Sequence, residues 1–122
     1  MISLELAQKL KAAGLEWTPK NGDCFYDGCI GPLLVCHHLA LNDNWVDKAA
    51  NGTFAPRLDQ LIAKIEARGW EADSVQHKGK YACDIAYLSD TVHTKYQTFA
   101  GETREDAAGL AYLWIMEQDA HV

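Results

Sequence analysis

The sequence predicts an α+β fold, in which an antiparallel sheet of four or five strands is flanked by helices as a two-layer or α/β/α sandwich. Segments with apolar residues at helical spacing alternate with short segments rich in aromatic and β-branched residues. Gly, Pro and Asn residues separate them. The 122 residues have the length of one domain, without an internal repeat or linker, so we expect a single domain over residues 1–122.

The N-terminal helix is predicted over residues 3–13, where Leu6 and Leu10 lie on one side. Gly14 ends it in the left-handed cap position, because glycine adopts positive φ without steric strain. Residues 16–19 then run into a proline, and the residue before a proline avoids the helical region. We expect an extended segment there.

Two strand-like segments, 24–28 and 33–39, lie on either side of a Gly-Pro pair and predict a hairpin. If the turn centres on Ile30, each residue faces the one at the same distance from the turn. The expected cross-strand pairs are Tyr26 with Leu34 and Cys24 with Cys36.

A long loop is predicted at residues 41–54, which are rich in Asn, Asp and other turn formers. Loops of this length often carry function. Trp45 lies inside the loop and Phe54 ends it, and Trp is a frequent anchor of protein interfaces. We expect Trp45 either at such an interface or packed back over the core.

The second helix is predicted over residues 56–68. Pro56 suits the first helical turn, where its missing N–H is not needed. An apolar stripe at i, i+3, i+4 and i+7 predicts that one helix face is buried, formed by Leu58, Leu61, Ile62 and Ile65. Gly69 ends the helix.

Three strands are predicted after this helix, at residues 70–76, 81–88 and 96–100. A turn at 77–80 joins the first two strands, and a loop at 89–93 joins the last two. Alternate residues of the middle strand share one face: Tyr81, Cys83, Ile85 and Tyr87.

The last helix is predicted over residues 103–118. Thr103 can cap the free amides of its first turn, with Asp106 reaching back in a capping box. Residues 110–116 are apolar on every side, and such a helix is buried on more than one face. This helix therefore either lies at the centre of the domain, with Trp114 in the core, or forms a homodimer.

Several short patterns occur together in this chain. The second half contains RGW at 68–70, YAC at 81–83, and FAGET at 99–103 followed by EDAA and an apolar helix. The first half contains LAQKLKAAGLEW at 6–17, Gly22-Asp23, Phe25-Tyr26 and PRLDQL at 56–61. These features resemble the phage ABA-sandwich proteins, small proteins of bacteriophages and mobile elements with a sheet and flanking helices.

The resemblance covers residues 4–27 and 54–118, whereas residues 29–54, with their Cys and His side chains, lie outside it. It implies an origin in a phage or another mobile element and brings no established activity. Small proteins of this kind often act by binding and modulating a host or phage protein. The resemblance therefore implies a protein partner of that class.

Charge and composition disfavour two classes of partner. The net charge is −6 with a pI near 5.2, and Lys and Arg form no cluster of the kind that binds a nucleic-acid backbone. No apolar run approaches the ~20 residues of a membrane span, and the N-terminus does not have the pattern of a signal peptide. We expect an acidic cytoplasmic protein with reduced cysteines, which binds neither nucleic acid directly nor membranes.

The segment 24–38 holds three Cys and two His residues and is the strongest metal-binding candidate. The ligands of a zinc ion would be Cys24, Cys36 and His38 on one face of the hairpin, with His77 or Cys83 as the fourth. Gaps of four and six residues between the cysteines match structural zinc sites poorly. The alternatives are cysteines that fill a strand face as small apolar residues, or a cross-strand disulfide under oxidation. We therefore assign no metal and no cofactor.

A catalytic interpretation would rest on Cys83, which lies next to Asp84, with His77 and His93 near the two ends of its predicted strand. No nucleophile elbow and no Gly-rich phosphate loop accompany these residues. We expect no catalytic residues and no enzyme activity.

Together these observations predict a non-enzymatic phage or mobile-element accessory protein that acts by protein–protein binding. Inhibition of a host defence system such as CRISPR or restriction is one such role. The alternatives are a zinc-stabilised interaction module built on the hairpin at 24–38 and a small enzyme of unknown class.

Overall fold

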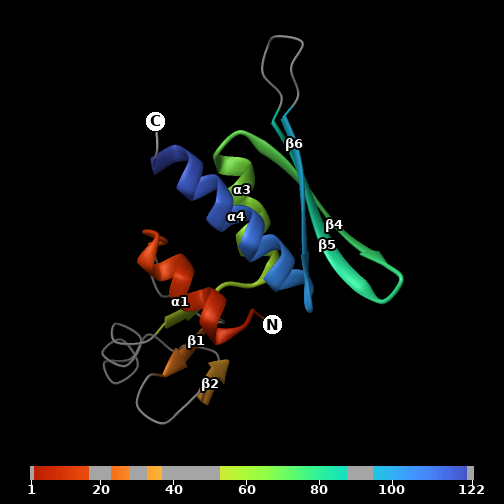
Figure 1. The fold of residues 1–122 in the computed structure, drawn as a ribbon. Helices are drawn as coiled ribbons and strands as arrows, with labels where there is room; N and C mark the ends of the chain where they lie inside the picture. Colours follow the sequence, from red (N-terminus) through yellow and green to blue (C-terminus); the bar gives the residue numbers. More distant parts are fainter. Residues whose placement is uncertain (1, 17–22, 28–32, 37–52, 88–94, 121–122) are drawn as a thin grey trace.

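The computed structural model describes residues 2–16, 23–27, 33–36, 53–87 and 95–120. In this part of the chain the helices are α1 (Leu4–Ala12), α3 (Leu58–Ala67) and α4 (Arg104–Ala120). The strands form two antiparallel sheets of three strands each within the same residues (Figure 1). The predicted α+β class is confirmed, whereas the single sheet of four or five strands is wrong.

Sheet A consists of β1 (Cys24–Asp27), β2 (Leu33–Cys36) and β3 (Thr53–Ala55), in the order β2-β1-β3. Its hairpin has the predicted register, with Cys24 opposite Cys36 and Tyr26 opposite Leu34. β3 was not expected, because Thr53 and Phe54 belong to the predicted loop at 41–54, yet both pair with β1. The rest of that predicted loop, with Trp45, lies outside the described residues.

Sheet B consists of β4 (Trp70–His77), β5 (Lys80–Tyr87) and β6 (Lys95–Gly101), in the order β4-β5-β6. The three predicted strands are confirmed to within one residue at each end. The β4–β5 hairpin turns through Lys78 and Gly79, with φ of 52° and 77°. Positive φ at both central residues matches the right-handed twist of the strands, as in a type I′ turn.

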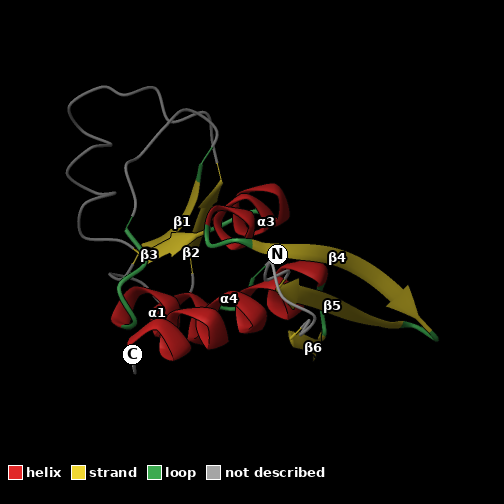
Figure 2. Cartoon of the chain, turned by 90° about the horizontal axis from the view of Figure 1, so that it is seen from above, coloured by secondary structure: helices red, strands yellow, loops and turns green. Residues whose placement is uncertain are grey.

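Helix α3 separates the two sheets along the chain. β3 pairs with β1, and this pairing completes sheet A before α3 begins. β4 starts after α3 and, within the described residues, pairs with β5. Both α3 and α4 contact sheet B and lie on the same face of it (Figures 1 and 2). The strands that the sequence predicts are thus divided between two small sheets, with helices between them.

Local sequence signals set the ends of α1. The Ser3 hydroxyl accepts a hydrogen bond from the Leu6 amide at 3.3 Å and caps the first turn. Gly14 has φ of 107°, and the Leu15 amide donates to the Leu10 carbonyl at 3.0 Å, as in a Schellman ending. The predicted glycine cap is therefore confirmed.

Helix α3 begins two residues later than predicted. Its N-cap is Arg57, whose amide donates to the side-chain carbonyl of Gln60 at 2.8 Å. Pro56 does not occupy the first helical turn, because it lies between β3 and the N-cap of α3. Its side chain is buried there. Gly69, with φ of 86°, follows the helix as predicted.

Helix α4 lies at the centre of the molecule and contacts α1, α3 and all three strands of sheet B (Figure 1). This is the first of the two positions that its apolar sequence predicts. Its buried side chains are those of Ala107, Ala108, Ala111, Tyr112, Ile115 and Met116. A Cβ added at Gly109 would lie 2.9 Å from Leu6 and 3.0 Å from Ile2. The missing side chain therefore makes room for the N-terminal segment against α4.

Hydrogen bonds between distant segments hold the N-terminal residues in place. The Thr103 hydroxyl accepts from the Asp106 amide at 3.0 Å, as the capping pattern predicts. The Asp106 carboxylate accepts from the Ser3 amide at 2.7 Å and so bridges the first turns of α4 and α1. The Tyr26 hydroxyl donates to the Ile2 carbonyl at 2.7 Å. The N-terminal segment thus connects α4 with β1.

The turn between β6 and α4 leaves no room for a side chain at Gly101. A Cβ there would lie 2.6 Å from the Ala107 backbone nitrogen and 2.9 Å from the Asp106 Cβ. We predict that Gly101→Ala lowers the free energy of unfolding by about 1–3 kcal/mol, because the start of α4 must shift to relieve the contact. Urea denaturation followed by circular dichroism measures this change.

The control is Glu102→Ala at the exposed neighbouring position, which should stay within about 0.5 kcal/mol of wild type. A Gly101→Ala variant as stable as this control would contradict the prediction.

Candidate functional site

The Cys/His hairpin lies mostly outside the described residues. Its backbone pairs Cys24 with Cys36 as predicted, but Cys29 and His38 are not among the described positions. In the part of the chain that the structure describes, no three His, Cys, Asp or Glu side chains are grouped so that they could hold a metal ion. Cys83, one of the two expected fourth ligands, lies in the core on the other sheet. The zinc site therefore stays an alternative hypothesis beside the prediction of no metal.

Cys83 is fully buried, at 0% exposure, on the face of β5 that packs against α4. Burial, together with the nearby charges of Asp84 and Asp73, raises the pKa of its thiol to about 11. At neutral pH the side chain is therefore a thiol and a poor nucleophile. The His77 side chain and all of His93 lie outside the described part of the chain. Of the Cys83, His77 and His93 side chains in the catalytic interpretation, the structure therefore describes only that of Cys83.

Trp114 packs against the core, as predicted. Its ring meets Trp70 edge-on, with centroids 5.6 Å apart, and lies 5.9 Å from Phe99. Trp70 in turn contacts Tyr87, with centroids 5.3 Å apart. These rings join α4 to all three strands of sheet B.

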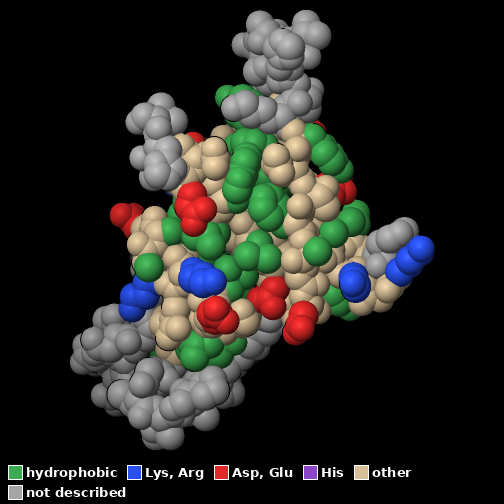
Figure 3. All heavy atoms as spheres, viewed as in Figure 1, with side chains coloured by type: hydrophobic (Ala, Val, Ile, Leu, Met, Phe, Trp, Pro, Cys, Tyr) green, Lys and Arg blue, Asp and Glu red, His purple; other side chains and the backbone are tan. Residues whose placement is uncertain are grey.

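Apolar side chains gather between α4 and β6 on the face seen in Figure 3. The partly buried apolar residues of these two elements are Phe99, Leu110, Leu113 and Trp114. Leu110, Leu113 and Trp114 are thus apolar side chains of α4 that stay partly exposed after the helix has packed into the centre of the molecule.

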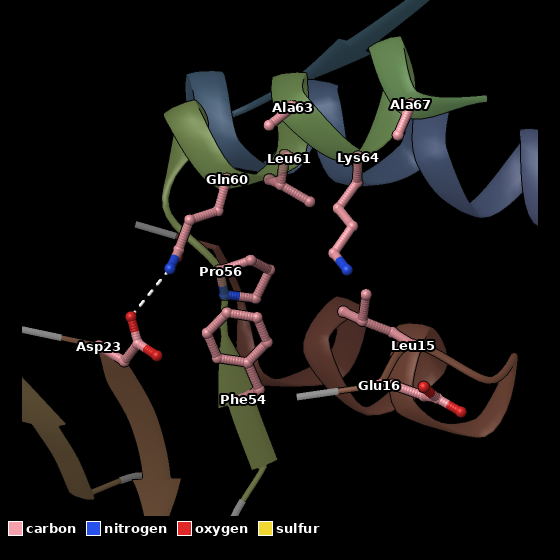
Figure 4. A pocket seen from close by; sticks show the side chains of 10 residues that line it. All are labelled: Leu15, Glu16, Asp23, Phe54, Pro56, Gln60, Leu61, Ala63, Lys64 and Ala67. Carbon is pink, nitrogen blue, oxygen red and sulfur yellow. Dashed lines mark hydrogen bonds between the residues drawn. The ribbon is translucent and has the colours of Figure 1, made fainter. Parts of the chain in front are cut away.

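A cavity of about 490 Å³ opens between the end of α1, β3 and α3 (Figure 4). This volume falls in the range of about 300–1,000 Å³ that is typical of small-molecule sites. The apolar lining residues are Leu15, Phe54, Pro56, Leu61, Ala63 and Ala67. The polar ones are Glu16, Asp23, Gln60 and Lys64. We call this space the α1–α3 cavity.

Asp23 forms the inner polar wall of the α1–α3 cavity and is only 3% exposed. Its Oδ1 accepts a hydrogen bond from the Gln60 amide at 2.9 Å (Figure 4) and lies 3.5 Å from the Arg57 guanidinium. A buried carboxylate needs partners of this kind, because it has lost its hydration. Gln60 and Arg57 thus compensate the negative charge of Asp23 within the protein. The same hydrogen bond holds the Gln60 side chain in place on the cavity wall.

Among the described residues that line the α1–α3 cavity, Lys64 is the one basic residue. Its ammonium group reaches from α3 toward the space between Phe54 and Leu15, and the Glu16 carboxylate points away from it (Figure 4). The ion pairs found between described residues do not include Lys64. The cavity thus combines an apolar lining with a positive charge that has no partner in the described part of the chain.

The face of sheet B that points away from α3 and α4 is uncovered by any other described element (Figures 1 and 2). Cross-strand pairing arranges its side chains in three rows, because alternate residues of each strand share a face. The rows are Val75–Ala82–Ala100, Asp73–Asp84–Thr98 and Glu71–Ala86–Tyr96. We call this surface the open face.

The middle row of the open face places two like charges side by side. Asp73 lies directly opposite Asp84, and the Thr98 hydroxyl donates to Asp84 at 2.8 Å. Like charges in directly opposite positions destabilise a sheet. The ion pairs between described residues include neither carboxylate. The open face therefore carries an uncompensated acidic centre between two rows with apolar side chains.

Comparison with known protein families, curated proteins and solved structures found no match to the chain. The resemblance to phage ABA-sandwich proteins therefore stays a prediction from the sequence pattern. None of the described helices combines the length and the apolar composition that crossing a bilayer requires.

Sequence reasoning missed both the α1–α3 cavity and the open face. Asp23 follows a glycine and reads as a turn residue, so nothing local indicates that it is buried. Lys64 lies between the apolar positions of its helix, where a solvated lysine is ordinary. The open face did leave a signal, because Glu71 and Asp73 alternate with inward-facing residues of β4.

We predict that Cys83 resists alkylation in the folded protein. With a pKa of about 11, about one thiol in ten thousand is ionised at pH 7, and the side chain is also inaccessible. Pulse labelling with iodoacetamide, read by peptide mass spectrometry, should leave Cys83 unmodified until urea unfolds the chain.

The matched control is Val75→Cys, which places a thiol on the opposite, exposed face of the same sheet and should be labelled in the folded state. Labelling of Cys83 at a rate similar to this control would contradict the prediction and restore Cys83 as a candidate nucleophile.

Proposed function

We propose that the protein is a non-enzymatic, cytoplasmic accessory protein of a bacteriophage or another mobile element, which acts by binding a host or phage protein. Inhibition of a host defence system, such as CRISPR or restriction, is one role of this kind. The sequence resemblance supports the mobile-element origin. The observation that carries the binding role is the open face of sheet B, which no other described element covers.

The open face has the composition of an interface. Tyr96 is 60% exposed and Val75 is 36% exposed. The alanines at the centre of two rows have short side chains, so they do not project from the sheet. Tyrosine is enriched at the energetically important positions of protein interfaces. A partner that covered these rows would remove apolar surface from water, which favours association.

The partner that fits the open face is a protein surface with Lys or Arg side chains between apolar ones. Asp73 and Asp84 repel each other in the free protein, because they lie in directly opposite positions. A basic side chain placed over them would remove this repulsion and form charge-assisted hydrogen bonds. A role in binding would thus explain why the sheet keeps Asp73 and Asp84 in opposite positions despite their repulsion.

We predict that a photo-crosslinking amino acid at Val75 captures a basic protein from a lysate of the native host cell. Asp73→Lys combined with Asp84→Lys should lower the yield of this adduct at least about tenfold, because like charges then meet across the interface. Immunoblots of the adduct and mass spectrometry of the captured protein provide the measurement.

The control variant, Glu5→Lys combined with Glu66→Lys, makes the same change in net charge at exposed positions on α1 and α3 and should leave the adduct unchanged. No adduct from position 75, or an equal loss in the control, would contradict the proposal. An adduct with a second copy of the chain would instead indicate a homodimer through the open face, which differs from the homodimer through the apolar helix at 103–118 that the sequence predicts as an alternative.

A second candidate function is a zinc-stabilised interaction module. The confirmed register of the β1–β2 hairpin favours it, because Cys24 and Cys36 are cross-strand neighbours. Two thiolates in such positions can share one zinc ion when two further ligands are supplied. His38 remains the expected third ligand.

We predict that any zinc bound by untagged protein is lost from Cys24→Ser and Cys36→Ser variants, because each substitution removes a thiolate ligand. Inductively coupled plasma mass spectrometry measures the metal content, with Cys83→Ser as the control that should retain it. Wild-type protein that carries no zinc after expression in zinc-supplemented medium would exclude this second function.

A further inference from the structure

We propose that the α1–α3 cavity binds a small apolar carboxylate, that is, a single carboxylate group attached to an aromatic or branched aliphatic body. The cavity lies apart from the open face of sheet B, and the inference does not depend on the proposed function. It rests on the shape of the cavity, on its apolar lining and on the Lys64 ammonium.

The cavity suits a compact apolar body. Phe54, Pro56 and Leu61 come from one continuous stretch of β3 and α3, and Leu15 faces them from the end of α1 (Figure 4). Its volume of about 490 Å³ accommodates a single aromatic ring with a short side arm. Burial of such a ring against these side chains supplies the non-directional part of the binding energy.

The exposed side of the cavity is kept open by small residues. Ala63 and Ala67 occupy successive turns of α3 at the rim, and both are exposed. A longer side chain at either position would cover the entrance. Access from solvent therefore depends on two alanines of the helix.

The charges of the lining select an anion. Asp23 already accepts hydrogen bonds from Gln60 and Arg57, so its charge is met inside the protein. The Glu16 carboxylate points away from the Lys64 ammonium in Figure 4. Lys64 is thus the charge directed at the cavity. Lys64 is an exposed residue, and its ammonium can form a charge-assisted hydrogen bond with a carboxylate whose apolar body lies against the cavity lining.

The single ammonium also limits the kind of anion. Phosphate groups carry more charge and are usually bound by several donors, such as Arg side chains or the amides of a helix N-terminus. Lys64 lies in the second half of α3, away from the N-terminal amides of that helix. A singly charged carboxylate matches this site better than a phosphate.

Two sources can supply this chemistry: a free small acid, or the C-terminal residue of a protein chain. A second cavity of about 320 Å³ shares Leu15, Glu16, Lys64 and Ala67 with the first and continues to Arg68 and Tyr112. It offers a path for the rest of a peptide whose last residue occupies the α1–α3 cavity. The experiment therefore includes both kinds of ligand.

The test is a titration of ¹⁵N-labelled protein followed by heteronuclear NMR, with three probes: phenylacetate, its neutral amide phenylacetamide, and the peptide Gly-Gly-Phe with a free C-terminus. We expect saturable shifts at the amides of Leu15, Leu61 and Lys64, with dissociation constants on the order of millimolar for phenylacetate, as is usual for a ligand of this size. Phenylacetamide should bind at least about fivefold more weakly, because it lacks the charge that pairs with Lys64.

Lys64→Met should abolish the preference for phenylacetate over phenylacetamide, whereas Lys9→Met, at an exposed position on α1, should keep it. Ala63→Phe should reduce binding of both probes, because the larger side chain covers the entrance. Tighter binding of Gly-Gly-Phe than of phenylacetate assigns the site to a chain terminus, and the reverse assigns it to a free acid. Shifts that do not saturate, or equal binding of acid and amide to the wild type, would overturn the proposal.

Discussion

The burial of α4 on several sides is the constraint on which the rest of the structure depends. Helix α1, helix α3 and sheet B all pack against it, and each would otherwise expose an apolar face. Small side chains make this arrangement possible, because Ala107, Ala108 and Gly109 allow the N-terminal segment to approach the helix backbone closely. Larger residues such as Ile115 and Met116 then fill the core, and complete burial of each stabilises the fold by roughly 1.5–3 kcal/mol.

Features that depend on neighbouring residues were predictable from the sequence. The glycine ending of α1 at Gly14, the Thr103 cap and the Cys24–Cys36 register all follow from signals within a few residues of each other. The division into two sheets was not predictable in this way. It depends on β3, a strand of three residues at Thr53–Ala55, which pairs with β1 across a long stretch of sequence. A segment this short has almost no periodicity, so turn-forming neighbours dominate its local pattern.

The candidate sites show the same limit. The sequence directed attention to Cys and His residues, because their chemistry is conspicuous, yet Cys83 is a protonated core residue. The α1–α3 cavity depends on Asp23 and Gln60, which are 37 positions apart in the chain and are joined by a hydrogen bond. The open face depends on which side of sheet B α3 and α4 pack against. Neither choice is encoded in a local motif, so both sites became visible only when the elements were placed in space.

The hydrogen bond between Ser3 and Asp106 also has a consequence for the order of folding. Its two residues are separated by 103 positions, and Ile2 beside it becomes buried only when α4 is in place. During synthesis the N-terminal segment leaves the ribosome long before its partner helix exists. The apolar side chains of Ile2 and α1 that pack on α4 therefore stay exposed until α4 is released. This domain is completed only after α4 has left the ribosome, and the newly made segment is most open to aggregation, or to capture by another protein, before then.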